Sequence, residues 1–144
     1  MMPTRKLEDV IQGQTIVTAP STLSVLEASK KMAAARVGAI MILEGERLIG
    51  LFTERDALNR VLAAGRDPAH TTLKDVMTTN LQTIDAGKPL GHAMHIMYEG
   101  GFRHVPVLDN GRPVGMVSAR DALGLEMVAF EHELEQRNSI TELL

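Results

Sequence analysis

The sequence predicts an α/β (α+β) fold made of two copies of one unit, and three observations support this. The chain repeats itself at an offset of 65 residues, so that GLFTERDAL at 50–58 aligns with GMVSARDAL at 115–123. A fixed offset that spans a whole unit is typical of an internal structural repeat. Within each copy, a segment with helical spacing of apolar residues precedes two short apolar runs. Hydrophobic residues make up 44% of the 144, enough for a packed core, although only 3% are aromatic.

The first copy is predicted to contain a helix, a strand hairpin and a second helix. The segment 24–35 opens with a capping-box pattern and places its apolar residues on one helical face. The apolar runs 39–43 and 48–52 are short enough for buried strands, with the turn 44–46 between them. Thr53 then stands where a helix N-cap is expected.

The second copy is predicted to repeat these elements. Apolar residues at helical spacing predict a helix that starts near Leu90, and the runs 105–108 and 114–117 predict the strand pair. Asn110-Gly111 between these runs is a strong hairpin signal. Ser118 is the N-cap candidate of the last helix. With a short strand at the start of each copy, the order is β-α-β-β-α twice.

The repeats are predicted at residues 7–64 and 72–125, followed by a C-terminal helical extension and tail at 126–144. The segment 65–68 (GRDP) is expected to break the helix between the two copies. The opening segments 7–11 and 73–77 also match, but at an offset of 66, so one residue has been inserted or deleted between them and the rest.

The last helix is predicted to carry an apolar stripe, because large apolar residues recur there at 4-3-4 spacing. Two interpretations are open: the stripe packs on its own domain, or it forms a helix seam in a dimer. The residues of the stripe are Leu123, Met127, Phe130 and Leu134.

Charge and composition argue against several classes of function. The formal net charge is -3 with no basic cluster, which gives no support to a nucleic-acid binder. Cysteine is absent, so disulfides, zinc fingers and Cys nucleophiles are excluded. The sequence shows no signal peptide and no apolar run long enough to cross a membrane. We therefore expect a cytoplasmic protein without membrane contact.

The repeated motif Gly-x-x-Ser/Thr-x-x-Asp lies at a strand-to-helix junction in both copies. The positive end of a helix favours an anion, a hydroxyl at the junction can donate to a phosphate oxygen, and a carboxylate one turn later can accept hydrogen bonds from ribose hydroxyls. The motif glycines, Gly50 and Gly115, are expected to let a backbone approach closely. A structural interpretation competes, because Ser/Thr-x-x-Asp is also a near capping box. The spacing alone leaves both open.

These motifs, together with Asp75-Val76-Met77-Thr78 and the segment 102–107 (FRHVPV), resemble a tandem pair of cystathionine-β-synthase (CBS) domains, known as a Bateman module. The resemblance covers about residues 7–125. It implies two repeats related by pseudo-twofold symmetry and packed through their sheets. It also implies a regulatory module that binds adenosine-containing ligands, namely AMP, ADP, ATP, NAD-type dinucleotides or S-adenosylmethionine, in clefts between the repeats.

The resemblance assigns expected roles to individual residues. Asp56 and Asp121 would hold ribose hydroxyls, and Thr53 and Ser118 would contact phosphate. Charge for the phosphates is expected mainly from repeat 2, where Arg103 and His104 stand opposite small residues of repeat 1. The full set of expected ligand contacts is Thr18, Gly38, Ala39, Ile40, Thr53, Arg55, Asp56, Thr83, Arg103, His104, Val105, Pro106, Ser118, Arg120 and Asp121.

The other function classes have weaker support. No nucleophile or base stands beside either Asp, and no P-loop or dinucleotide fingerprint occurs, so we expect no enzyme and no required cofactor. His92, His95 and Glu99 lie at helical spacing, yet a solvated helix face explains them better than a metal site. A ligand-independent dimerisation or docking module is the remaining alternative. We expect a homodimer that regulates a partner protein in trans.

Overall fold

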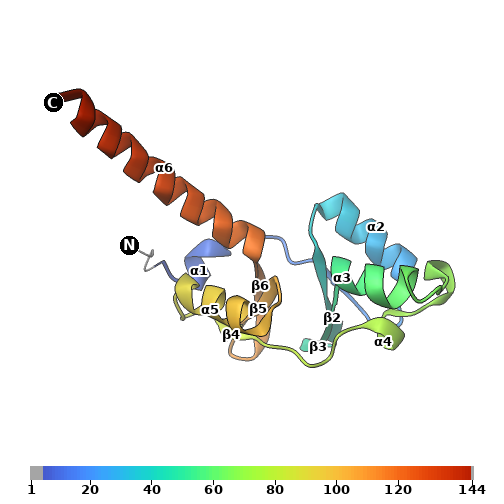
Figure 1. Cartoon of the computed structure of the whole chain (residues 1–144). Helices are drawn as coiled ribbons and strands as arrows, with labels where there is room; N and C mark the ends of the chain where they lie inside the picture. Colours follow the sequence, from blue (N-terminus) through green and yellow to red (C-terminus); the bar gives the residue numbers. More distant parts are fainter. Residues whose placement is uncertain (1–4, 144) are drawn as a thin grey trace.

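The structure is a computed structural model that describes residues 5–143, without the side chains of 125, 126, 128, 129 and 138–143 in the last helix. It confirms the mixed α/β fold with two repeats, as Figure 1 shows. Each repeat contributes one three-stranded sheet, with the strand orders β1-β2-β3 and β4-β5-β6. The first strand of each sheet is parallel to the second, and the second and third form an antiparallel hairpin.

The elements of the first repeat follow the expected order. Ser24 caps the first long helix, because its hydroxyl accepts a hydrogen bond from the Glu27 N–H at 3.1 Å. That helix ends at Arg36, whose φ of 57° places it in the left-handed region. The elements are β1 (Thr18–Ala19), α2 (Val25–Ala35), β2 (Ala39–Glu44), β3 (Arg47–Thr53), α3 (Glu54–Asp56) and the π-helical segment η1 (Ala57–Leu62).

The second repeat reproduces these elements at the same offset. Thr18 pairs with Met41 in repeat 1, and Ile84 pairs with Val107 in repeat 2. The second pair is the equivalent of the first, displaced by one residue along both strands from the 65-residue offset. Both hairpins shift register at equivalent points. The elements are α4 (Leu73–Val76), β4 (Ile84–Asp85), α5 (Leu90–Gly100), β5 (His104–Asp109), β6 (Arg112–Ser118) and α6 (Ala119–Leu143), and the 3-10 helix η2 (Pro68–His70) lies between the repeats.

The short helix that opens each repeat packs on the sheet of the other repeat. In the N-terminal helix α1 (Leu7–Val10), Leu7 is fully buried in the core of repeat 2 beside Leu90 and Val105. In α4, Leu73 is fully buried in the core of repeat 1. Figure 1 shows α1 beside α5 and the second sheet, and α4 beside the first sheet. The two repeats are therefore interlocked, because each needs a segment of the other to complete its core.

Backbone hydrogen bonds fix both crossings, that is, the two places where an opening helix and the residues after it (7–14 and 73–78) pack on the other repeat. The Leu7 N–H donates to the Lys88 carbonyl at 2.9 Å, and the Leu73 N–H donates to the Leu23 carbonyl at the same distance. These bonds satisfy helix-end donors that an isolated short helix would leave unpaired. Each opening helix is thus held by main-chain contacts as well as by apolar packing.

The motif glycines make room for these crossings. A Cβ on Gly115 would lie 2.8 Å from three carbons of Ile11, and a Cβ on Gly50 would lie 2.6 Å from the Met77 sulfur. Both glycines are buried, and the groups that approach them come from the segments following α1 and α4. A close approach is therefore present at both glycines. At Gly115 it is made by the Ile11 side chain, and at Gly50 by the Met77 side chain and the Thr78 backbone.

We expect Gly115→Ala to lower the free energy of unfolding by about 1–3 kcal/mol, because the added methyl overpacks against the branched Ile11 side chain. Gly124→Ala is the matched control, since nothing lies within 4 Å of a Cβ there and alanine favours a helix. Urea unfolding of both variants measures the difference. Equal stabilities of the two variants would show that the Gly115 contact is not tight.

The stripe on α6 does not pack on its own domain. Its four side chains remain substantially exposed, at 62% for Leu123, 46% for Met127, 52% for Phe130 and 39% for Leu134. Figure 1 shows why, because α6 continues straight from β6 and projects away from both sheets. The helix is continuous from Ala119, so the predicted extension at 126–144 is not separated from repeat 2 by a break.

Candidate functional site

The motif of repeat 1 forms a complete capping box. The Asp56 N–H donates to the Thr53 hydroxyl at 3.2 Å, and the Thr53 N–H donates to the Asp56 carboxylate at 3.0 Å. Asp56 is only 6% exposed, and its carboxylate also accepts the Thr78 hydroxyl and lies 3.5 Å from Arg60 Nε. This carboxylate is therefore buried and surrounded by donors of the chain itself.

The motif of repeat 2 forms only half of that arrangement. The Asp121 N–H donates to the Ser118 hydroxyl at 3.0 Å, which caps α6. Asp121 is exposed, and its carboxylate makes no hydrogen bond or ion pair with any residue that the structure describes. The two motifs thus share a sequence pattern but differ in the burial and hydrogen bonding of their carboxylates. The carboxylate of repeat 2 is free to accept hydrogen bonds.

Residues of both repeats meet near the start of β2 and β5. A Cβ on Gly38 would collide with the Glu54 carboxylate and would lie 3.2 Å from His104 Nε2, so these two side chains converge on Gly38. The Arg55 guanidinium also crosses between the repeats, donating to the Gly101 carbonyl at 3.4 Å. Gly38 therefore leaves room for the Glu54 carboxylate, and the His104 ring of repeat 2 lies close to it.

The environment of His104 favours its neutral form. Partial burial lowers the pKa of His104 below its usual value, and the positive charge of Arg103 acts in the same direction. The carboxylates of Glu54 and Asp121 oppose this shift, but burial prevails. The ring therefore lies within electrostatic range of the free carboxylate of repeat 2, and it would gain positive charge if an anion entered the site.

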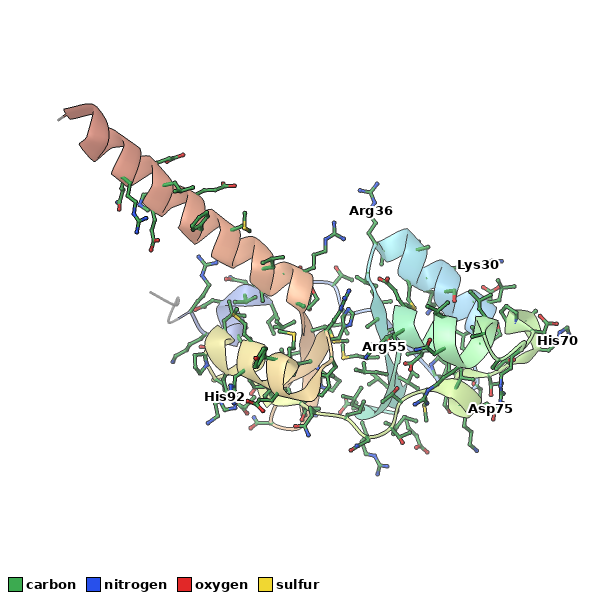
Figure 2. All side chains as sticks on the ribbon, viewed as in Figure 1. Lys30, Arg36, Arg55, His70, Asp75 and His92 are labelled. Atoms are coloured by element: carbon green, nitrogen blue, oxygen red, sulfur yellow. The ribbon has the colours of Figure 1, made fainter. Side chains whose placement is uncertain are left out.

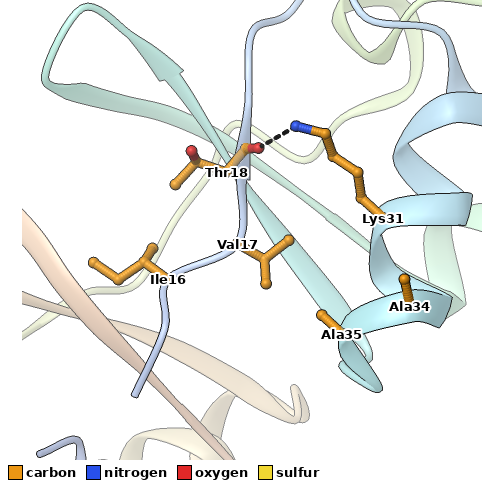
Figure 3. A pocket seen from close by; sticks show the side chains of 6 residues that line it. All are labelled: Ile16, Val17, Thr18, Lys31, Ala34 and Ala35. Carbon is orange, nitrogen blue, oxygen red and sulfur yellow. Dashed lines mark hydrogen bonds between the residues drawn. The ribbon is translucent and has the colours of Figure 1, made fainter. Parts of the chain in front are cut away.

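A cavity of about 490 Å³ opens beside Thr18 in repeat 1, as Figure 3 shows. Its rim carries one charge, Lys31, whose Nζ donates to the Thr18 carbonyl at 3.4 Å. The lining residues are Ile16, Val17, Thr18, Lys31, Ala34 and Ala35.

Gln14 ties the segment that leads into this cavity to the second repeat. Its side-chain amide donates to the Met116 carbonyl at 2.9 Å and accepts from the Met116 N–H at 2.7 Å. Met116 precedes Ser118 by two residues, and Ile16 follows Gln14 by two. The cavity and the Ser118–Asp121 pair therefore flank the same short crossing segment.

The remaining expected contacts divide by burial. Ile40 and Val105 are fully buried in the two cores, and Ala39 and Pro106 are also buried, so their side chains do not face an open cleft. Strand pairing causes this, because the apolar runs that they belong to lie in the middle of each sheet. Thr83, Arg103 and Arg120 are exposed.

Several residues of this region escaped the sequence reasoning. Thr78, Arg60, Gln14, Glu54 and Lys31 all contact motif residues or their neighbours. Two signals were available in the sequence: Thr78 ends the Asp75-Val76-Met77-Thr78 motif, and the offset of 66 at the opening segments indicated a one-residue insertion or deletion.

In the part of the chain that the structure describes, no three metal-ligating side chains cluster. His95 lies 3.9 Å from Glu99, and Figure 2 shows His92 on repeat 2, far from His70 at the other end of the molecule. His70 instead pairs with Asp67 at 2.6 Å, and this hydrogen bond lowers the pKa of Asp67. Of the described helices, none has the length and apolarity that a bilayer crossing requires.

Comparison with known proteins decides the family. The model of the CBS domain matches twice, over residues 7–63 and 73–127. The chain belongs to the CBS domain family. A CBS domain-containing protein of Arabidopsis thaliana is 31% identical over 118 residues, which cover 81% of this chain and 22% of that protein. The chain thus spans about a fifth of that relative's length.

Solved structures of CBS proteins share the fold. A CBS domain pair in complex with 5′-methylthioadenosine and S-adenosyl-L-methionine has a TM-score of 0.79 and 26% identity, covering 88% of this chain and 99% of the other. A CBS domain protein from Pyrobaculum aerophilum complexed with AMP has a TM-score of 0.75 and 26% identity, covering 86% and 98%. The two halves described above are therefore a tandem CBS pair.

Proposed function

We propose that this CBS pair is a regulatory module that binds an adenosine-containing ligand between its repeats and signals to a partner protein in trans. The free carboxylate of Asp121 beside the Ser118 hydroxyl and near His104 carries the proposal. The Asp121 carboxylate can accept hydrogen bonds from ribose hydroxyls. The Ser118 hydroxyl and the His104 ring can donate hydrogen bonds to a phosphate. The related structures with AMP and S-adenosylmethionine support the ligand class.

Each part of the ligand has a chemical counterpart near this carboxylate. Asp121 accepts the ribose hydroxyls, while Ser118 and the exposed Arg103 and Arg120 contact the phosphates. The cavity beside Thr18 combines the apolar side chains of Ile16 and Val17 with the polar groups of Thr18 and Lys31, a mixture that can contact both the faces and the edge of a purine base. No cofactor is required in this proposal, and the module acts by binding rather than by catalysis.

A thermal-shift panel tests the ligand class. The purified chain is heated with AMP, ADP, ATP, NAD or S-adenosylmethionine, and with GMP and GTP as controls. At one hundred times its dissociation constant, a ligand stabilises the native state by about 2.7 kcal/mol, a shift on the order of 5–10 °C for a chain of this size. We expect a shift with an adenosine compound and none with guanine. No shift with any adenosine compound would refute the proposal.

We expect the affinity for a phosphate-bearing ligand to rise as the pH falls from about 8 to 6, more in the wild type than in His104→Gln. Because burial lowers the pKa of His104, the free protein holds it neutral, and a nearby phosphate favours its protonated form. Ligand titration is common to both proteins, so their difference isolates the histidine. The expected difference is at most about tenfold per pH unit.

Adenosine, which lacks phosphate, is the control for this measurement and should show no difference between the two proteins. The free protein changes in the opposite sense. Since the unfolded chain takes up the proton first, His104 should reduce stability as the pH falls below about 6.5. Parallel pH profiles of the wild type and His104→Gln with AMP would contradict this role.

The exposed stripe on α6 favours a second feature, a homodimer formed through this helix. Four large apolar side chains on one face at 4-3-4 spacing match the seam of a two-helix interface, and Glu131 and Glu135 lie on its flank. A second copy of the chain presents the same stripe and is therefore self-complementary. If no ligand binds, the module would act through this interface alone.

We expect Phe130→Asp to convert the dimer to a monomer, because it places a charge at the centre of the stripe. Gln136→Asp adds the same charge on the opposite face and should leave the dimer intact. Sedimentation equilibrium distinguishes the two. A wild-type monomer at micromolar concentration would contradict the proposed seam.

A further inference from the structure

The two motif carboxylates, which are equivalent in sequence, differ in how many of their hydrogen-bond sites the chain already fills. Asp56 Oδ2 accepts the Thr53 N–H at 3.0 Å and the Thr53 hydroxyl at 3.2 Å. The Thr78 hydroxyl lies 3.1 Å from Oδ1 and 3.2 Å from Oδ2, so it is shared between both oxygens. Arg60 Nε lies 3.5 Å from Oδ1. A ribose diol would have to displace one of these donors.

Thr78 holds this position because its backbone is fixed to the edge of β3. The Thr78 N–H donates to the Leu51 carbonyl at 2.8 Å, and the Leu51 N–H donates to the Thr78 carbonyl at 2.9 Å. Gly50 beside Leu51 leaves room for this segment, since a Cβ there would lie 3.3 Å from the Thr78 carbonyl oxygen. The hydroxyl is thus held over Asp56 by a rigid pair of main-chain bonds.

The equivalent crossing in repeat 2 lacks this hydroxyl. Met116 is the counterpart of Leu51, but it pairs with the side chain of Gln14 rather than with a backbone segment. The residues aligned with Thr78 are Gln12 at an offset of 66 and Gly13 at an offset of 65, and Gly13 turns the chain with a φ of 78°. None of the described residues of this segment donates a hydrogen bond to the Asp121 carboxylate.

We infer that Thr78 acts as an internal substitute for a ribose hydroxyl, so that the module takes one adenosine-type ligand per chain, at Asp121 and not at Asp56. This inference rests on the proposed function. A single hydroxyl shared by both carboxylate oxygens makes the same type of contact that a ribose hydroxyl would make. The contact is intramolecular and already ordered, which gives it a large effective concentration against a free ligand.

Isothermal titration calorimetry of the full chain with AMP, ATP and S-adenosylmethionine in turn tests this inference. We expect one ligand per wild-type chain. Asp121→Asn should weaken binding at least fivefold, whereas Asp56→Asn should keep both stoichiometry and affinity within about twofold and lower the unfolding midpoint. Two equivalents bound by the wild type, or equal weakening by the two Asn variants, would overturn the inference.

The Thr78 variants test the substitute directly. Thr78→Ala removes the hydroxyl but keeps the backbone pair with Leu51, and we expect a second ligand to bind at Asp56. Thr78→Ser keeps the hydroxyl and is the matched control, with one ligand per chain. A single site in a folded Thr78→Ala protein would overturn the role of Thr78. Absence of binding by the wild type would refute the proposed function itself, which two-site binding would not.

Discussion

We expect Asp121→Ala to weaken the binding of the adenosine ligand by about 1–3 kcal/mol, or roughly 5- to 150-fold in the dissociation constant. The ribose hydroxyls lose a charged acceptor that the first turn of α6 holds in place. A water molecule that takes its place is neither charged nor fixed. Stability should change little, because the helix cap is made by the Ser118 hydroxyl and the backbone of residue 121. Calorimetric titration at constant salt and pH measures the change.

Asp109→Ala is the matched control for this variant. It removes the same charge from the exposed end of β5 in the same repeat, so any general electrostatic effect on an anionic ligand appears there too. Ligand affinity of Asp109→Ala should equal that of the wild type within about twofold. If both variants bind as the wild type does, Asp121 is a helix-end residue without a role in binding.

The second large effect concerns the crossing of the opening helices. We expect Leu73→Ala to lower the free energy of unfolding by about 2–5 kcal/mol, because Leu73 is fully buried in the core of repeat 1 with Phe52 and Ile40. Leu62→Ala is the control, since Leu62 is 69% exposed and should change stability by less than about 0.5 kcal/mol. Urea unfolding followed by circular dichroism gives both values.

The interlocking adds a further expectation to this experiment. Because Leu73 precedes repeat 2 in the chain but completes the core of repeat 1, the damage should spread to both repeats and the unfolding curve should remain a single transition. An early separate transition of one repeat in Leu73→Ala, or a loss no greater than in Leu62→Ala, would show that the crossing is a minor contact.

The repeat could be predicted from the sequence because apolar periodicity and turn residues act locally. The helix at 24–35, the hairpin turn at Asn110-Gly111 and both Ser/Thr caps lie where the pattern placed them. The crossing could not be predicted, since an internal repeat shows which segments are equivalent and not which of two like sheets each one covers. For the same reason, the sequence predicted a close approach at Gly50 and Gly115 but not that Met77 and Ile11 would make it.

The difference between the two candidate sites was hidden for a related reason. Asp56 and Asp121 occupy the same position in the same motif, and what separates them is a hydroxyl 22 residues from Asp56 in sequence. Such a contact depends on where the segment that contains Thr78 packs against β3, and tertiary packing determines that position. Burial of Ile40 and Val105 likewise follows from strand order within each sheet, which a list of motif positions does not contain.

The most direct test of the central claim is a crystal structure of the chain grown with the adenosine compound that gives the largest thermal shift. We predict that its ribose hydroxyls lie within hydrogen-bond distance of the Asp121 carboxylate, with phosphate or its equivalent beside Ser118 and His104. A ligand whose ribose contacts Asp56, or one bound outside the contact between the repeats, would contradict the account.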